Sequence, residues 1–181
     1  LEEAEGLVVV DEAYGEFSDQ TALDLLPDFG NLLILKTFSK ALGAAGIRIG
    51  YLLGHPPIVA EILKAKIPFD INVFSHTAAI HILDRPGLIR SRADATLAER
   101  DRVESAMQKM DGVTPYPSSA NFVLFEISHP AAVFTRLVER GVLIRDVTGY
   151  PMLEKAMRVS IGTPDENDAF LDALRDALTA A

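Results

Sequence analysis

The sequence lacks cysteine, and this absence excludes several kinds of site. With no cysteine among its 181 residues, the chain cannot form a disulfide, a zinc–thiolate centre or a cysteine nucleophile. It also lacks any apolar run as long as the roughly 20 residues of a membrane-spanning helix. Basic residues are outnumbered, 17 against 26 acidic ones, and the net charge at pH 7 is −9. This balance argues against nucleic acid and anionic membranes as partners.

The remaining composition is that of an ordinary globular protein, with 49% hydrophobic and 24% charged residues. A chain of this length forms one large domain or two small ones. The first five residues do not resemble a signal peptide. A cytoplasmic location fits the absence of cysteine. The first residue is a leucine and not a methionine. We therefore expect a fragment that begins within a larger fold.

Short apolar runs in the first part of the chain are typical of strands buried in a parallel sheet. Three such runs cover residues 7–10, 32–35 and 48–53. A helical turn is predicted for residues 21–26. A helix is predicted from Pro56 to about residue 66, because proline suits a first helical turn.

Helical spacing dominates the middle of the chain, and an α+β pattern follows it. Residues 74–83 and 86–110 predict two helices, and Gly112 ends the second of them. Beyond that glycine, the pattern predicts strands at 120–127, 142–145 and 157–161 and helices at 130–140 and 164–178. We therefore expect three regions, namely residues 1–70 as part of a large domain, 71–111 as a helical connector and 112–181 as a small α+β domain.

Chemically active side chains follow the first two predicted strands. Asp11 and Tyr14 come after the first strand and Lys40 comes after the second. Because ligands in open α/β sheets bind outside the carboxyl ends of the strands, we expect these three side chains at one edge of the sheet. Taken singly, each has an ordinary explanation, such as a solvated lysine or a turn aspartate. As a set, they supply an amine, a carboxylate and a phenol.

A guanidinium and two hydroxyls complete the set of groups that pyridoxal phosphate needs. Lys40 suits the aldehyde of this cofactor, Asp11 its ring nitrogen and Tyr14 its ring oxygen. The phosphate suits Arg48, whose guanidinium binds phosphate oxygens in a bidentate way, together with the hydroxyls of two neighbouring residues. Those residues are Thr37 and Ser39. The histidines are scattered without metal-ligand spacing, so we predict no metal site; they are His55, His76, His81 and His129.

Several motifs resemble one family. Asp-Glu-Ala-Tyr at 11–14, Thr-Phe-Ser-Lys-Ala at 37–41 and Gly-Ile-Arg-Ile-Gly-Tyr at 46–51 resemble the fold-type I aminotransferases that bind pyridoxal phosphate. Within them, Gly-Val-Leu-Ile-Arg-Asp at 141–146 and Met-Arg-Val-Ser-Ile-Gly-Thr at 157–163 are most similar to the histidinol-phosphate aminotransferases. The resemblance implies an α/β fold, made of part of a large cofactor-binding domain with a mostly parallel sheet and a small α+β domain.

The resemblance also implies roles for residues of the second half. Arg158 matches the arginine that receives the α-carboxylate of glutamate, and Arg145 matches the one near the phosphate of histidinol phosphate. Without the family, both arginines read equally well as surface residues at strand ends. Asn121 either helps to orient Arg158 or satisfies the backbone at the start of a strand. Lys40 matches the lysine that bonds covalently to the cofactor.

The expected activity is reversible amino transfer between histidinol phosphate and 2-oxoglutarate, in histidine biosynthesis. Family members are about twice as long and form homodimers, so we expect the carboxyl-terminal half of such a protein, inactive by itself. Close alternatives are an aromatic amino-acid aminotransferase and a threonine-phosphate decarboxylase. An alternative of another class is a non-catalytic domain with the pyridoxal-phosphate fold, or an inactive fragment.

Overall fold

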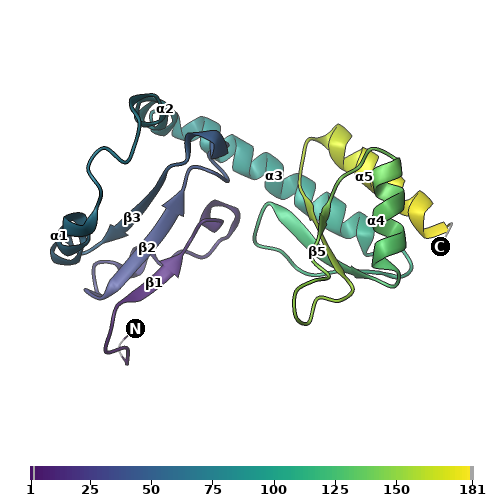
Figure 1. The fold of residues 1–181 in the computed structure, drawn as a ribbon, viewed down its shortest axis with the longest axis horizontal. Coiled ribbons are helices and arrows are strands. Elements are labelled where there is room, and N and C mark those ends of the chain that lie inside the picture. The colour runs from purple at the N-terminus through teal and green to yellow at the C-terminus, as the bar shows by residue number, and fades with distance from the viewer. Residues whose placement is uncertain (2, 180–181) are drawn as a thin grey trace. The chain divides into compact units, whose positions relative to one another are not determined.

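The computed structural model describes residues 1 and 3–179, and in it the chain divides into two units, Leu1–Ala93 and Asp94–Ala181. Each unit has its own sheet (Figure 1). The division falls within helix α3 (Pro86–Met107). The three expected regions, with limits at 70 and 111, stay a prediction, and their residues 2, 180 and 181 lie outside the described part.

The sheet of the first unit begins with two parallel strands, as predicted. Strand β1 (Val8–Asp11) pairs with β2 (Leu32–Thr37). Leu32 and Ile34 on β2 are completely buried, which explains the uninterrupted apolar run. Two short 3-10 helices, η1 (Gly15–Phe17) and η2 (Leu23–Leu25), lie in the connection between the strands.

The structure corrects two predictions about this sheet. Strand β3 (Gly50–Gly54) runs antiparallel to β2, whereas the sequence suggested a parallel strand. Its link to β2 contains only η3 (Ala45–Ile47) and no crossover helix that could return the chain to the same end of the sheet. The prediction that the strands are buried on both faces is also wrong, because Val9 of β1 is 54% exposed and Leu35 of β2 is 37% exposed.

The helices of the first unit begin where the sequence indicates. Helix α1 (Pro56–Ala65) has proline in its first turn, where the missing amide proton costs nothing. Helix α2 (Val73–Leu83) is capped by Asn72, whose side chain accepts a hydrogen bond from the Ser75 amide at 2.9 Å. No helix within the described residues is long and apolar enough to cross a membrane.

The second unit is an antiparallel sheet with helices packed on one face. The strands lie in the order β4 (Val113–Pro115), β5 (Phe122–Ile127), β7 (Ala156–Ser160) and β6 (Arg145–Asp146). Helices α4 (Pro130–Glu139) and α5 (Pro164–Thr179) lie side by side (Figure 1). Alternate residues of the central strands form the core with both helices.

Strand β6 is shorter than predicted and lies later in the chain. The Val142 amide donates to the carbonyl of Leu137 at 2.8 Å, and the Gly141 amide to that of Val138 at 2.9 Å. Because these bonds close the end of α4, the chain joins β7 only from Arg145. Strand β4 was not predicted, since three residues that end in proline give little pattern.

Candidate functional site

The first unit places Asp11 and Lys40 after neighbouring parallel strands. Asp11 is the last residue of β1 and lies level with Leu35 of β2. Strand β2 continues to Thr37, and Lys40 follows in the next turn. The Asp11 carboxylate is exposed, and its Oδ1 accepts a hydrogen bond from the Ala13 amide at 2.9 Å. An acid and an amine thus come at the carboxyl ends of two neighbouring parallel strands, at the same edge of the sheet.

Tyr14 contacts Lys40 directly. It occupies the third position of a turn that the Gly15 amide closes on the Glu12 carbonyl at 3.0 Å. Its φ of −112° and ψ of 9° are close to those of this position in a type I turn. The Lys40 Nζ lies 4.9 Å from the centre of the Tyr14 ring, within the range of a cation–π contact.

The loop around Lys40 is fixed by backbone hydrogen bonds. The Lys40 carbonyl accepts a hydrogen bond from the Gly43 amide at 2.8 Å, and the Ala44 amide donates to the Phe38 carbonyl at 2.9 Å. Gly43 has a φ of +66°, and a Cβ there would meet the Arg92 Nη1 at 3.2 Å. The positive φ makes a side chain unfavourable at Gly43, whereas the Arg92 guanidinium could move aside.

The remaining predicted cofactor residues lie on either side of the Lys40 turn. The Thr37 Oγ1 accepts a hydrogen bond from the Ser39 amide at 3.1 Å. Arg48 is exposed and has left-handed backbone angles, φ 55° and ψ 44°. Its Nη1 donates to the Ala45 carbonyl at 2.9 Å. A left-handed arginine is uncommon, and such conformations concentrate at functional sites.

A buried ionic cluster lies beside these residues, and sequence reasoning missed it. The Lys36 Nζ is 2.9 Å from Glu12 Oε2 and 3.2 Å from Glu16 Oε1. The side chains of Lys36 and Glu12 are only 8% and 7% exposed. A signal was present, because Lys36 follows the buried Leu32 and Ile34 at spacings of two along β2. A lysine on a buried face needs an acidic partner.

The cluster keeps its members charged. Burial opposes ionisation of Glu12, but hydrogen bonds from the Ala22 amide, Lys36 and Thr21 outweigh it and hold the pKa of Glu12 below its ordinary value. Burial likewise opposes the charge on Lys36, yet Glu12 and Glu16 raise its pKa above the ordinary value. At neutral pH the cluster therefore holds a lysine cation between two carboxylates.

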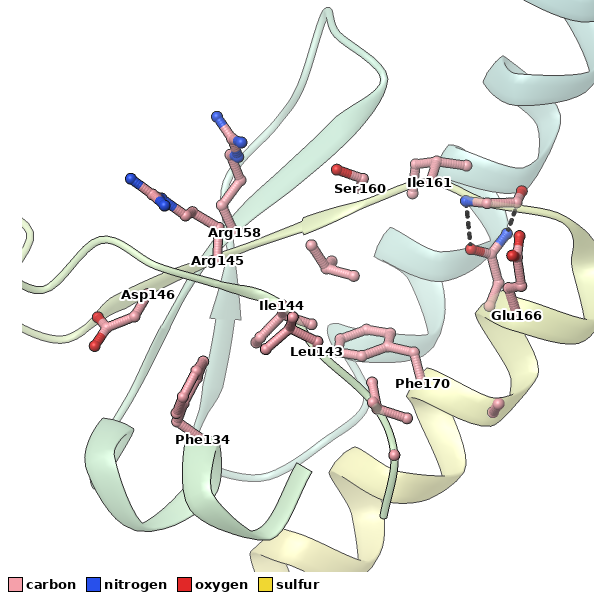
Figure 2. Close-up of a pocket in the computed structure, with 16 residues that line it drawn as sticks. Phe134, Leu143, Ile144, Arg145, Asp146, Arg158, Ser160, Ile161, Glu166 and Phe170 are labelled. Carbon is pink, nitrogen blue, oxygen red and sulfur yellow. Dashed lines mark hydrogen bonds between the residues drawn. The ribbon is translucent and has the colours of Figure 1, made fainter. Parts of the chain in front are cut away.

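The second unit brings Arg145 and Arg158 face to face on adjacent strands. They are direct partners in the pairing of β6 with β7. Arg158 lies between the buried Met157 and Val159, so it points away from the core. Both arginine side chains extend to the same side of the strands, opposite Phe134 and Phe170 of α4 and α5 (Figure 2).

The surroundings of the arginines suit an anion. The Arg158 guanidinium lies 4.9 Å from the centre of the Phe122 ring, and its buried Nε has no hydrogen-bond partner among the described residues. Like charges on paired strands repel, and an anion between them relieves this repulsion. Hydrogen bonds from Thr148 lower the pKa of Asp146, so a carboxylate stays charged close to Arg145. Both arginines border a hollow of about 420 Å³, together with Leu124, Val147, Tyr150 and Leu153.

Asn121 lies at the end of the same sheet. Its carbonyl accepts a hydrogen bond from the Ile161 amide at 2.9 Å, and this contact extends the pairing of β5 with β7. A role of its side chain toward Arg158 stays a prediction.

Sequence reasoning missed the buried Asn167, whose side-chain amide binds both backbone groups of Gly162, at 2.9 and 3.1 Å (dashed lines in Figure 2). Asn167 thereby fixes the chain beyond β7.

A family model now bears on these two groups of residues. The model for "Aminotransferase class I and II" matches residues 1–174. The chain belongs to this family. The histidinol-phosphate aminotransferase of Chlorobaculum tepidum is 39% identical over 176 residues, covering 97% of this chain and 51% of that protein. The predicted resemblance is thereby confirmed, and the chain spans about half the length of the relatives it matches.

Solved structures of aminotransferases share the fold. The crystal structure of histidinol-phosphate aminotransferase from Sinorhizobium meliloti, in complex with pyridoxal-5'-phosphate, gives a TM-score of 0.84 at 30% identity and covers 96% of this chain and 49% of that one. L-threonine-O-3-phosphate decarboxylase from Porphyromonas gingivalis gives 0.83 at 25% identity, covering 94% and 55%. The predicted fold class is confirmed. The similar scores explain why fold alone does not separate the two activities.

Proposed function

We propose that this chain is part of a pyridoxal-phosphate-dependent aminotransferase that acts on histidinol phosphate and 2-oxoglutarate in histidine biosynthesis. The observation that carries the proposal is the placement of Lys40 against Tyr14, after a strand that runs parallel to the one ending in Asp11. It occurs in a chain 39% identical to a histidinol-phosphate aminotransferase. When bound, pyridoxal phosphate supplies an electron-accepting ring that stabilises negative charge at the substrate α-carbon.

The chemistry of the first unit fits this cofactor. The exposed Asp11 carboxylate would hold the ring nitrogen and keep it protonated. Tyr14 would offer its phenol hydrogen to the ring oxygen. Lys40 would hold the cofactor at its aldehyde through the side-chain amine, and its Nζ would serve as the base toward the proton on the substrate α-carbon.

Three further residues of the first unit serve the phosphate. Arg48 is exposed, and its guanidinium can form two parallel charge-assisted hydrogen bonds with phosphate oxygens. The hydroxyls of Thr37 and Ser39 lie on the segment between β2 and Lys40 and add neutral donors. Each charge-assisted hydrogen bond contributes on the order of 1.5–3 kcal/mol.

The second unit supplies the substrate residues. Arg158 binds the α-carboxylate of glutamate, and Arg145 binds the phosphate of histidinol phosphate. Their pairing across β6 and β7 supports this assignment, because two adjacent guanidinium groups form one positive region that can hold either anion. Asn121 helps to orient Arg158. The whole protein acts on small molecules as a cytoplasmic homodimer and binds neither nucleic acid nor membrane; the net charge of −9 on this chain disfavours both.

The proposal is tested by assaying the full-length protein that contains this chain with pyridoxal phosphate and four candidate substrates. We expect amino transfer to 2-oxoglutarate to be fastest from histidinol phosphate, slower from phenylalanine and tyrosine, and accompanied by no release of carbon dioxide from threonine phosphate. Carbon dioxide release without transfer would replace the proposal with the decarboxylase. Cofactor binding without any turnover would favour a non-catalytic domain.

Arg158 gives a more specific prediction. Arg158→Lys keeps the charge but removes the planar two-pronged geometry. We expect the single-turnover reaction with glutamate to slow by about 30- to 900-fold, which corresponds to about 2–4 kcal/mol of transition-state free energy. Arg175→Lys is the matched control, because Arg175 forms an exposed ion pair with Asp172 on α5. A glutamate rate within about threefold of wild type would remove Arg158 from the carboxylate site.

A further inference from the structure

The turn that carries Tyr14 rests on the buried Lys36. Its two ends are Glu12 and Gly15, and both contact the lysine. Glu12 forms the 2.9 Å ion pair with Lys36. A Cβ added to Gly15 would lie 2.8 Å from the Lys36 Nζ and 3.1 Å from the Glu12 Cβ. A side chain at position 15 would therefore have to displace the Lys36 ammonium from its place beside the turn.

Glu12 ties this turn to two other segments. Its amide donates to the Leu35 carbonyl of β2 at 2.9 Å, so the backbone extends the pairing of β1 with β2. Its carboxylate accepts hydrogen bonds from the Thr21 hydroxyl at 3.0 and 3.1 Å and from the Ala22 amide. One buried carboxylate thus holds strand β2, the turn and the segment at 21–22 together.

The 12–15 turn contacts the chain of β2 and the residues after it at two successive places. Glu12 meets Lys36 inside β2, and Tyr14 meets Lys40 beyond the end of β2. The first contact is buried and doubly charged, whereas the second is a single cation–π contact that is individually weak. The strong contact therefore fixes where the weak one forms.

We propose that Glu12 and Lys36 are positioning residues that hold the Tyr14 ring against Lys40. For catalysis, their importance rests on the function proposed above. Neither residue faces the cofactor itself in this scheme. They act by fixing the position of the 12–15 turn relative to β2, and this position sets the distance between the Tyr14 ring and the Lys40 amine.

The contact is measured directly by NMR without cofactor, using protein with ¹³C-labelled tyrosine and lysine side chains. The variant Tyr14→Phe identifies the Tyr14 ring signal by its disappearance. Wild type should show a nuclear Overhauser effect between this ring and the Lys40 side chain. Lys36→Met should weaken it at least fivefold and shift the Tyr14 signal, whereas Lys36→Arg, which keeps the charge, should restore most of it. Lys64→Met is the control, because Lys64 forms an exposed ion pair with Glu61.

A second variant keeps the test decisive if Lys36→Met does not fold. Thr21→Val removes the hydroxyl that donates to Glu12 and accepts from the Leu23 amide at 3.2 Å, and Thr21 is exposed. It should weaken the effect at least twofold while the circular dichroism stays that of wild type. An unchanged Tyr14–Lys40 contact in folded Lys36→Met, or in Thr21→Val, would overturn the proposal. Because the readout needs neither cofactor nor turnover, it stands or falls separately from the proposed function.

Discussion

Replacing Lys40 with alanine is expected to slow amino transfer by about 10⁴-fold or more, because the variant loses both the amine that bonds to the cofactor and the base at the substrate α-carbon. Some non-covalent binding of pyridoxal phosphate should remain, since Asp11 and Arg48 are untouched. The two effects are separated by measuring turnover together with cofactor affinity by equilibrium dialysis.

Lys64→Ala is the matched control for this loss. Lys64 belongs to α1 and pairs with Glu61 at an exposed position, so its removal should leave turnover within about twofold of wild type. If Lys40→Ala retained a tenth of the wild-type rate, the lysine would not be the catalytic amine. Loss of all cofactor binding would instead assign Lys40 the main role in affinity.

Replacing Lys36 with methionine is expected to destabilise the first unit by about 3–5 kcal/mol at pH 7, because it leaves the carboxylate of Glu12 buried without its cation. Glu16 loses the same partner and has a buried Oε2 with no hydrogen-bond partner in the described part of the chain. The change is measured by hydrogen exchange of the β2 amides. Lys64→Met, which breaks only an exposed pair, should cost no more than about 1 kcal/mol.

The pH dependence of this difference follows from the two pKa shifts. The pKa of folded Glu12 lies below the ordinary 4.5, so its contribution is present above pH 4.5 and is lost as the pH falls through the folded value. The pKa of folded Lys36 lies above 10.5, so its contribution is complete below pH 10.5 and is lost as the pH rises through the folded value. The difference in the free energy of unfolding between wild type and Lys36→Met should therefore be constant from about pH 5 to 10 and shrink at lower pH. A difference that grows in acid would contradict a charged pair between Glu12 and Lys36.

Local rules explain which parts of the fold could be predicted from sequence. Pro56, Pro130 and Pro164 begin helices because their fixed φ suits a first turn. Gly141 directly follows the C-cap residue of α4 with a φ of +76°, a conformation that other residues avoid. Gly112, predicted to end the preceding helix, has a φ of +79° but lies in a turn five residues beyond the end of α3 at Met107. The direction of β3 could not be predicted, since an apolar run looks the same in a parallel and an antiparallel strand.

The candidate site was predictable only where the residues lie close in sequence to a strand end. Asp11 and Lys40 could be placed together because β1 and β2 are parallel neighbours. The contact of Glu12 with Lys36 depends on side-chain packing between segments far apart in the chain. The pairing of Arg145 with Arg158 likewise depends on strand register, which the shortened β6 sets.

The most direct test of the proposed site is to reduce the protein with borohydride in the presence of pyridoxal phosphate and to map the labelled peptide. Reduction makes the bond between the cofactor and its lysine permanent, so the label marks that lysine. We predict a single label on Lys40. A label on Lys36 or Lys64, or no label on a protein that binds the cofactor, would contradict the assignment of Lys40 and with it the proposed site.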